Sequence, residues 1–240
     1  DADIRLNRLD RCGHTGSQAV IWRVNWGDGE RSVWGPVALP LPGERGWALA
    51  ISHGDENGSA MVVGRILSVD NPWNASIAWN IQAQPDGTVA VDSPAIVLQS
   101  GDPADGDIYA NGVNDAGAVC GEAFWPPLGV VWSGGATSIL ASARDAPAAN
   151  ANDINNDNVI VGWGGQGQGW CEAVVWHSVD GKMVMLSKYL PRKNAPFTML
   201  IEAAAINTSG RIAGYGIDED DKVVQTPGYL AGNSRITVQD

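Results

Sequence analysis

The residues of this chain that could bind a sugar are aromatic rings and side-chain amides in expected loops: Trp73, Trp125, Trp163, Gln166, Gln168, Trp170 and Tyr215. The clearest segment is GWGGQGQGW at 162–170, where two tryptophans flank a run of glycine and glutamine. An indole ring offers a flat surface for the C–H face of a sugar, and an amide can bond its hydroxyls. The alternatives are that these rings pack under their own loops or contact another protein.

The acidic segment GIDEDDK at 216–222 carries carboxylates, which calcium prefers as ligands, with Asp218, Asp220 and Asp221 as the candidate set. The alternative is a solvated acidic loop. Crowding of like charges there could also raise the pKa of one carboxyl, as the acid of a glycosidase requires. Apart from calcium we expect no cofactor.

The histidines and cysteines predict no catalytic centre. The three histidines are scattered along the chain, and neither G-x-S-x-G nor H-E-x-x-H occurs, so we expect a non-enzymatic protein. Cys12, Cys120 and Cys171 lack the close spacing of zinc ligands. They are either small buried residues or one disulfide with one remaining thiol, and any two of the three could pair.

The composition is typical of a β-protein with many turns. The 240 residues include 30 Gly, 13 Pro and 11 Trp, and only 18% are charged, so turn formers outweigh the residues that cover helix surfaces. A net charge of −12 disfavours nucleic acid and anionic membranes as partners, since both require a basic surface. No run of 18 or more apolar residues occurs, so we expect no membrane insertion.

Four stretches share one pattern, in which a polar turn separates a short segment that begins with a small residue from an alternating apolar run that ends in glycine. They are ALAISHGDENGSAMVVG (48–64), ANGVNDAGAVCG (110–121), ANDINNDNVIVG (151–162) and AAAINTSGRIAG (203–214). The turns end on Gly58, Gly117, Asn158 and Gly210, residue types that accept a positive φ at low cost. Because a hairpin turn accounts for all four copies, the alternating Asp and Asn of 153–158 are interpreted as a turn rather than a calcium loop.

A second family of segments ends near a large aromatic residue: QAVIWR (18–23), ASIAWN (75–80), GVVWSG (129–134), EAVVWH (172–177) and TPGYLA (226–231). A further short apolar run follows each of them. Runs of four to six apolar residues between Gly and Pro predict strands, so the repeat unit is about four short strands. We expect the repeated aromatic positions to lie in the core, namely Trp22, Trp79, Trp132, Trp176 and Tyr229.

Five copies of this unit predict one all-β domain, a β-propeller of five blades with about four antiparallel strands each. The expected blades cover 1–45, 46–106, 107–149, 150–201 and 202–240. The first blade lacks a recognisable first strand, and DIRLNRL (3–9) is expected as its second. Either the last blade supplies the missing strand or sequence upstream of residue 1 does.

The repeat resembles the HAF-type probable extracellular repeat family of bacteria. The residues that carry the resemblance best are Ala203, Ile206, Asn207, Gly210, Ile212 and Gly214, and it covers roughly residues 48–240. The family's His-Ala-Phe signature is replaced here by Gln-Ala-Val and Glu-Ala-Val. The resemblance implies an exported protein, extracellular, periplasmic or at the cell surface, but no defined activity.

We therefore expect a non-enzymatic exported propeller that binds a glycan of the cell surface or matrix through its tryptophan-bearing loops. These loops join the second and third strands of each repeat unit. The first alternative is a structural or interaction subunit of a larger extracellular assembly, with a protein partner. The second is a polysaccharide hydrolase or lyase, which needs converging carboxylates or a metal. The sequence predicts neither the identity of the ligand nor the oligomeric state.

Overall fold

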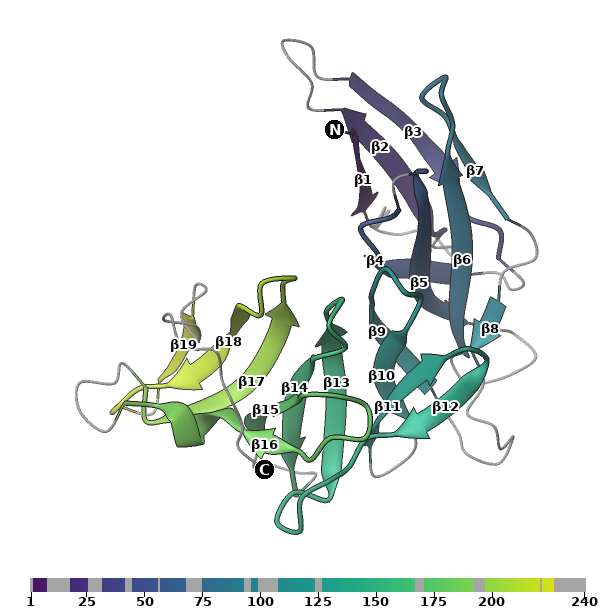
Figure 1. The fold of residues 1–240 in the computed structure, drawn as a ribbon. Coiled ribbons are helices and arrows are strands. Elements are labelled where there is room, and N and C mark those ends of the chain that lie inside the picture. Colours follow the sequence, from purple (N-terminus) through teal and green to yellow (C-terminus); the bar gives the residue numbers. More distant parts are fainter. Residues whose placement is uncertain are drawn as a thin grey trace. The chain divides into compact units, whose positions relative to one another are not determined.

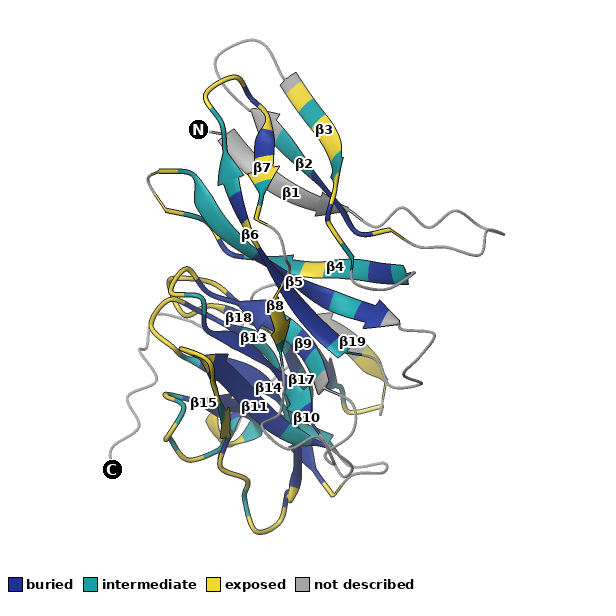
Figure 2. Ribbon diagram, turned by 90° about the vertical axis from the view of Figure 1, so that its right-hand side faces the viewer, coloured by how far each residue is buried: buried dark blue, intermediate teal, exposed yellow. Residues whose placement is uncertain are grey.

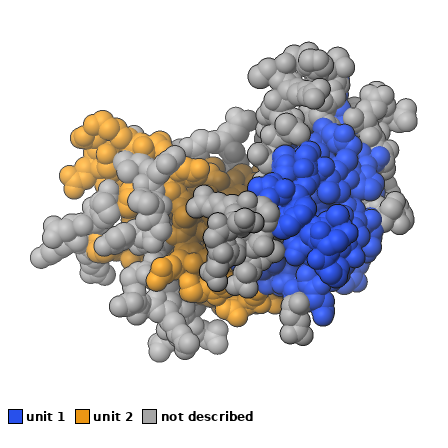
Figure 3. Space-filling model, turned by 90° about the horizontal axis from the view of Figure 1, so that it is seen from above, with its two compact units in different colours: residues 1–124, 132–137 blue, residues 125–131, 138–240 orange. Residues whose placement is uncertain are grey.

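The computed structural model describes residues 2–7, 18–25, 32–41, 45–55, 57–67, 75–92, 96–98, 108–123, 127–166, 171–191, 197–220 and 222–226. The chain divides into two compact units (Figure 3). Unit 1 comprises residues 1–124 and 132–137, and unit 2 comprises residues 125–131 and 138–240. The expectation of one continuous domain stays a prediction.

Within the described residues, all regular structure except one short 3₁₀ turn is β-strand, which confirms the all-β fold class. Antiparallel pairing joins the strands into five small sheets (Figure 1). Each sheet contains strands that are consecutive in the chain, as the repeat pattern predicts. The closure of these sheets into a five-bladed propeller stays a prediction.

Unit 1 holds two whole sheets. The first has the order β1-β2-β3, with β1 (Ala2–Asn7), β2 (Val20–Asn25) and β3 (Ser32–Ala38). The second has the order β4-β5-β6-β7, with β8 paired to β6; its strands are β4 (Arg45–Ile51), β5 (Ser59–Leu67), β6 (Ala75–Ala83), β7 (Val89–Val91) and β8 (Ile96–Leu98). The pairing of β1 with β2 confirms the strand expected within 3–9.

The third sheet has the order β12-β11-β10-β9. Its strands are β9 (Ile108–Val113), β10 (Val119–Ala123), β11 (Leu128–Ser133) and β12 (Ala136–Ile139). The division between the units passes through β11 and β12, so neither unit holds this sheet whole.

Unit 2 holds the remaining two sheets. One has the order β13-β14-β15-β16, with β13 (Ala148–Ile154), β14 (Ile160–Gly165), β15 (Cys171–Trp176) and β16 (Val184–Met185), followed by the 3₁₀ turn η1 (Leu186–Tyr189). The other has the order β17-β18-β19, with β17 (Met199–Ile206), β18 (Ile212–Ile217) and β19 (Val223–Thr226). The third strand of the last copy thus ends where the expected segment, 226–231, begins, and the rest of that segment lies outside the described residues.

The hairpins that join the first and second strands of the copies share one turn geometry. In three copies the turn begins on Asn114, Asn155 or Asn207, whose backbone N–H donates to the carbonyl four positions later at 3.0, 3.1 and 3.0 Å. The side-chain oxygen of the same Asn accepts the N–H of that later residue at 2.9, 3.0 and 2.8 Å. The residue just before each of these N–H donors has the predicted positive φ, which is 75° at Gly117, 58° at Asn158 and 76° at Gly210.

The longer β4–β5 hairpin is an extension of the same structure. Ser52 takes the place of Asn, because its N–H donates to the carbonyl of Met61 at 2.9 Å and its Oγ accepts the N–H of Met61 at 3.0 Å. The inserted residues then repeat the turn, beginning on Asp55, whose Oδ1 accepts the N–H of Ser59 at 2.8 Å. Gly58 has the expected positive φ of 80°.

The stretch at 153–158 uses its side-chain oxygens on the backbone. Oδ1 of Asn155 serves the turn, whereas Oδ2 of Asp153 accepts the N–H of Ile206 in β17 at 2.8 Å. The other carboxylate oxygen of Asp153 accepts the N–H of Ile154 at 2.9 Å. The stretch is a turn with a link from β13 to β17, which confirms the structural interpretation.

A β-bulge stands at the same place in the first strand of four copies. The residue that the strand register skips is Leu49, Asn111, Asn152 or Ala204. Opposite the bulges stand the glycines that end the sequence pattern, Gly64, Gly121, Gly162 and Gly214. A Cβ on any of these glycines would overlap a carbonyl oxygen of the facing strand, so the backbone itself excludes every larger residue.

The repeated tryptophans form part of the core. Trp79, Trp132 and Trp176 are buried, as predicted, whereas Trp22 is half-buried and Tyr229 lies outside the described residues. Each buried ring contributes about 2–3 kcal/mol. The indole N–H of Trp79 donates to the carbonyl of Pro40 at 2.6 Å, and that of Trp176 donates to the carbonyl of Ala141 at 2.8 Å.

Each unit has its own hydrophobic cluster. In unit 1, Ile21, Leu39, Val62, Ile77 and Trp79 pack together across the first two sheets. In unit 2, the cluster joins β14 and β15 to β17 and β18 through Val161, Ala173, Val175, Leu200, Ala203 and Ile212. Figure 2 shows the buried residues concentrated on inner strands such as β14 and β15.

Candidate functional site

Three of the seven candidate sugar-binding residues belong to the described part of the chain. Trp163 lies in β14, Gln166 directly follows that strand, and Tyr215 lies in β18. The other four fall outside the described residues: Trp73, Trp125, Gln168 and Trp170. The expectation that Trp163 and Tyr215 stand in loops is wrong, because backbone pairing continues on both sides of their strands past the repeat glycines.

Trp163 and Tyr215 do not face the same space. Trp163 shares its face of β14 with Val161, which belongs to the same hydrophobic cluster as Leu200 of β17. Buried and half-buried residues alternate along β18, and Tyr215 belongs to the half-buried face. Ile212, which lies in the same core as Val161, belongs to the opposite face. The structure therefore does not bring these two aromatic rings together.

The face of Trp163 carries a polar cluster, called here the unit-2 junction: Asn150, Asn152, Trp163, Cys171 and Glu202. Asn150 is the direct partner of Trp163 in the strand register. Asn152, the bulge residue, donates Nδ2 to Oε1 of Glu202 at 2.8 Å and to the carbonyl of Ala203 at 3.0 Å. Burial raises the pKa of the Cys171 thiol, and the negative charge of Glu202 raises it further.

Equivalent repeat positions in unit 1 form a second cluster, called here the unit-1 junction: Arg65, Tyr109, Asn111 and Glu122. Arg65 follows its repeat glycine as Trp163 does, and Tyr109, like Glu202, supplies the carbonyl that faces a repeat glycine. The Arg65 guanidinium lies 4.2 Å from the centroid of the Tyr109 ring. It also donates Nη2–H to Oδ1 of Asn111 at 2.8 Å.

The charge of Arg65 also acts on a neighbouring carboxyl. Burial raises the pKa of Glu122, and the positive charge of Arg65 opposes that rise. Arg65 therefore has an aromatic ring, an amide and a carboxylate around it, all from unit 1.

A hollow of about 460 Å³ lies in unit 2 next to the unit-2 junction. Its lining includes Asp145, Gly164, Gln166, Cys171, Glu172 and Met199. Gly164 and the following glycine bring no side chain into this space, and Gln166 belongs to its lining. Cys171 belongs to both the hollow and the junction, and the charged residues of the lining, Asp145 and Glu172, are both acidic.

A second hollow of about 460 Å³ lies within unit 1, and its lining includes Met61, Ile96, Val97, Leu98 and Trp132. Ile96 and Val97 are 45% and 44% exposed, although they belong to the short strand β8. This hollow contains none of the candidate sugar-binding residues.

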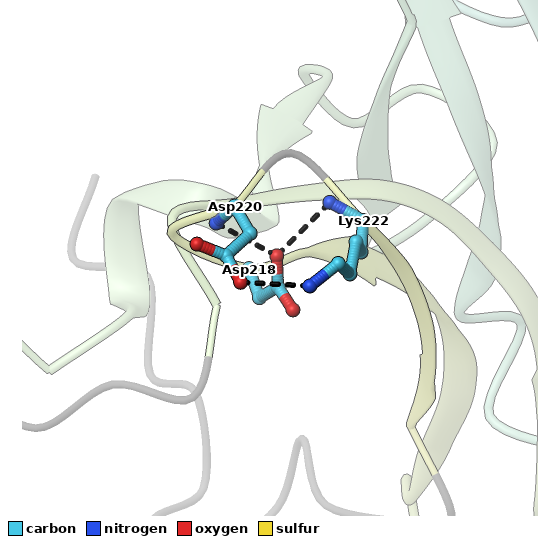
Figure 4. Close-up of polar contacts among 3 residues, drawn as sticks. All are labelled: Asp218, Asp220 and Lys222. Carbon is cyan, nitrogen blue, oxygen red and sulfur yellow. Dashed lines mark hydrogen bonds and ion pairs between the residues drawn. The ribbon is translucent and has the colours of Figure 1, made fainter.

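The acidic segment after β18 is a further copy of the hairpin turn (Figure 4). The backbone N–H of Asp218 donates to the carbonyl of Lys222 at 3.1 Å, and Oδ1 of Asp218 accepts the N–H groups of Asp220 and Lys222, both at 2.9 Å. The exposed Asp220 carboxylate pairs with Nζ of Lys222 at 2.8 Å. Asp221 lies outside the described residues, and calcium at this loop stays a prediction.

The described residues contain no metal centre of His, Cys, Asp or Glu and no disulfide. No three side chains of His, Cys, Asp or Glu gather there closely enough to hold a metal ion. Cys120 is buried and Cys171 half-buried, and both are thiols, while Cys12 is not described. No helix of the described part is long and apolar enough to cross a membrane.

The sequence interpretation missed Arg65, Asn152 and Glu202. A usable signal was present, since all three occupy fixed offsets from the repeat glycine or from the small residue that begins the pattern. The pattern could not show the bulge, which brings residues at these offsets together from different strands, as Asn152 and Glu202 are.

Comparisons with known proteins give no relative from which a function could be taken. No protein-family model, no curated protein and no solved structure matches the chain. The resemblance to HAF-type repeats accordingly stays a prediction drawn from the residues of this sequence.

Proposed function

We propose that this chain is a non-enzymatic, exported binding protein that holds a glycan in unit 2, at the hollow bounded by Gln166. The observation that carries the proposal is the combination of this hollow with the polar junction beside it. Trp163 stands at the junction and Gln166 at the hollow, three residues apart in the chain.

The chemistry of this region suits a sugar. The amide of Gln166 and the carboxylates of Asp145 and Glu172 offer donors and acceptors for hydroxyl groups. Met199 and the half-buried ring of Trp163 offer apolar surface for C–H groups. Amides and carboxylates beside an aromatic ring are the groups that the sequence interpretation sought in the tryptophan-bearing segments.

Glycan binding is tested by a glycan array followed by calorimetry on the hits, with wild type and the variants Trp163→Ala and Gln166→Ala. We expect each variant to weaken binding about tenfold or more, as the loss of a stacking ring or a buried hydrogen bond does. Val223→Ala is the matched control, because Val223 is 69% exposed in unit 2 and does not belong to the lining of the hollow. Unchanged binding by both site variants would contradict the named site.

The scaffold part of the proposal is a five-bladed propeller, each sheet being one blade. Its support is the recurrence of the bulge, the turn and the buried tryptophan at equal positions in successive sheets. Small-angle scattering of the purified chain tests it: a closed ring gives the compact profile of a single globular particle. Two separately scattering lobes would contradict it.

Export rests on the resemblance to the HAF-type repeats. It is tested by fractionating cells that make the native protein and detecting it by immunoblot. We expect the protein in the periplasmic, surface or medium fraction. Detection in the cytosolic fraction alone would contradict this location.

Exposed apolar residues at the hollow of unit 1 favour one alternative function, a subunit that docks into an extracellular assembly. Exposed Ile96 and Val97 offer the apolar surface that such a contact buries. Native mass spectrometry of the protein purified from its source separates the two functions. A stable complex that is lost in Val97→Asp supports the subunit, whereas a monomer supports the binding protein.

The two carboxylates in the hollow of unit 2 favour the other alternative, a polysaccharide hydrolase. Asp145 and Glu172 line one space, as a pair of catalytic carboxyls must. Incubation of the bound glycan with the protein, followed by chromatography of the products, tests it. Shortened chains that disappear in Glu172→Gln would establish hydrolysis, and intact glycan supports binding alone.

A further inference from the structure

The four methionines of the chain all lie at the two hollows, and none of them is fully buried. Met61 lines the hollow of unit 1, whereas Met185 and Met199 line the hollow of unit 2. Met183 lies against Gly164, another lining residue of the unit-2 hollow, because a Cβ on that glycine would be 2.9 Å from its sulfur. Thioethers are therefore concentrated at the hollows rather than in the hydrophobic core.

Two of these thioethers share one face of a sheet in unit 2. The register of β14, β15 and β16 puts Gly164, Val174 and Met185 on the same face. Met183 reaches this face as well, since its sulfur and Cγ1 of Val174 would lie 2.9 and 3.2 Å from a Cβ on Gly164. Cys171 pairs with the glycine after Gly164, so its thiol belongs to the opposite face.

The two described thiols are poor targets for oxidation. Cys120 is buried. Burial raises the pKa of the Cys171 thiol, and the negative charge of Glu202 raises it further, so little of the thiol is in the thiolate form that reacts with oxidants. A thioether needs no deprotonation before it reacts, and the methionines are half-buried. An oxidant should therefore modify the methionines before these cysteines.

We propose that Met185 and Met199 form an oxidation switch, in which their conversion to sulfoxides by hydrogen peroxide weakens glycan binding at the unit-2 hollow. At each sulfur a lone pair attacks one peroxide oxygen, the O–O bond breaks and an S–O bond forms. The departing oxygen takes up the proton of the transferred one and leaves as water, so the thioether is oxidised and the peroxide is reduced. This inference rests on the proposed glycan function and adds its regulation.

The lining of the hollow explains why a sulfoxide would disfavour the ligand. A sulfoxide converts a flexible apolar side chain into a polar one. Its oxygen accepts hydrogen bonds, but the charged residues of the described lining, Asp145 and Glu172, are carboxylates, which only accept when they are ionised. Water would therefore have to satisfy the new oxygen, and it would compete with the ligand for the apolar surface of the methionines.

The test applies the full chain to a glycan array in three states: untreated, treated with hydrogen peroxide, and treated with peroxide followed by the two methionine sulfoxide reductases, one for each epimer. Peptide mass spectrometry measures the oxygen gained at each methionine. We expect peroxide to weaken binding about tenfold and the reductases to restore it. Equal binding before and after oxidation of Met185 and Met199 overturns the switch while glycan binding stands. An untreated chain that binds no glycan overturns both.

Two double variants separate oxidation of these methionines from other damage. Met185→Leu with Met199→Leu cannot form a sulfoxide, so its binding should be equal before and after peroxide. Met185→Gln with Met199→Gln places polar groups at the same positions and should weaken binding about tenfold without peroxide. Met61→Leu, at the hollow of unit 1, is the matched control and should lose binding after peroxide as wild type does.

Cys171→Ser tests the thiol as the alternative target, and it should respond to peroxide as wild type does. Loss of the response in Cys171→Ser, or a response that persists in the leucine double variant, overturns the inference. Thermal unfolding of each chain before and after peroxide checks that it is folded. If the oxidised wild type is unfolded, damage rather than a switch explains the lost binding, and the inference is again overturned.

Discussion

The unit-1 and unit-2 junctions share one backbone geometry but differ in their charged side chains. The unit-1 junction contains the cation of Arg65, whereas the unit-2 junction contains Glu202. Both form where a β-bulge faces a glycine, and both join side chains from adjacent copies of the repeat. In unit 1, Arg65 contacts Tyr109 and Asn111 and fills the junction with a charge of its own. In unit 2, Glu202 accepts a hydrogen bond from the amide of Asn152. Under the proposed function, one repeat geometry serves stability in unit 1 and binding in unit 2.

The largest effect should come from the feature that both junctions share, the glycine opposite the bulge. Gly64→Ala in unit 1 and Gly162→Ala in unit 2 should each lower the free energy of unfolding by about 3 kcal/mol or more, because the new Cβ overlaps backbone. Denaturant titration measures this loss. Gly210→Ala is the control: its φ is 76° but nothing lies within 4 Å of the new Cβ, so about 1 kcal/mol is expected. Equal losses of unfolding free energy in Gly162→Ala and Gly210→Ala would contradict a specific role for the glycine opposite the bulge.

A second prediction concerns the different roles proposed for the two junctions. Arg65→Ala should lower the free energy of unfolding by about 2 kcal/mol, since a cation–π contact and a charged hydrogen bond are lost together. Glu202→Gln should change it by less than about 0.5 kcal/mol, because the amide of Asn152 keeps an acceptor. Both are measured by the same titration. A loss in Glu202→Gln as large as that in Arg65→Ala would contradict the division of roles.

The pH dependence of unit 1 gives a third prediction. Burial raises the pKa of Glu122 in the folded state above its ordinary value of 4.5. The folded state therefore holds the proton of Glu122 more tightly than the unfolded state does. The contribution of Glu122 to stability falls as the pH rises from its ordinary pKa through its raised pKa in the folded state. The stability of wild type relative to Glu122→Gln should fall between pH 4 and pH 7, measured by denaturant titration at each pH. A relative stability that rises with pH would contradict the assigned direction.

The smallest effect concerns the turn of unit 2 in which Asn158 stands where other copies have glycine. Asn158→Gly should raise the free energy of unfolding by about 0.5 kcal/mol, because φ is already 58° and glycine adopts it without strain. Asn156→Gly in the same turn should lower it slightly, since that position lacks a positive φ. Thermal unfolding of both variants measures the difference. Stabilisation by both would show that the turn geometry is not the cause.

The sequence predicted the strands, the turns and the buried tryptophans because each depends on a short local pattern. Asn155 and Asn207 each lie three residues before a residue with a positive φ, so a stretch of four residues is enough to predict the turn. The candidate site was harder to predict, because Asn152 and Glu202 meet only through the bulge and the packing of β13 against β17. Trp163 was found as a candidate but assigned to a loop, since its glycine-rich surroundings conceal that the strand pairing continues.

The bulge has a consequence for how such a chain can change its specificity. Leu49, Asn111, Asn152 and Ala204 are skipped by the strand register, so a substitution there leaves the hydrogen-bond ladder of the sheet in place. Their present identities already range from aliphatic to amide. The side chains at these four positions can therefore vary while the backbone stays constant. A library that varies them alone should yield folded proteins with different ligands.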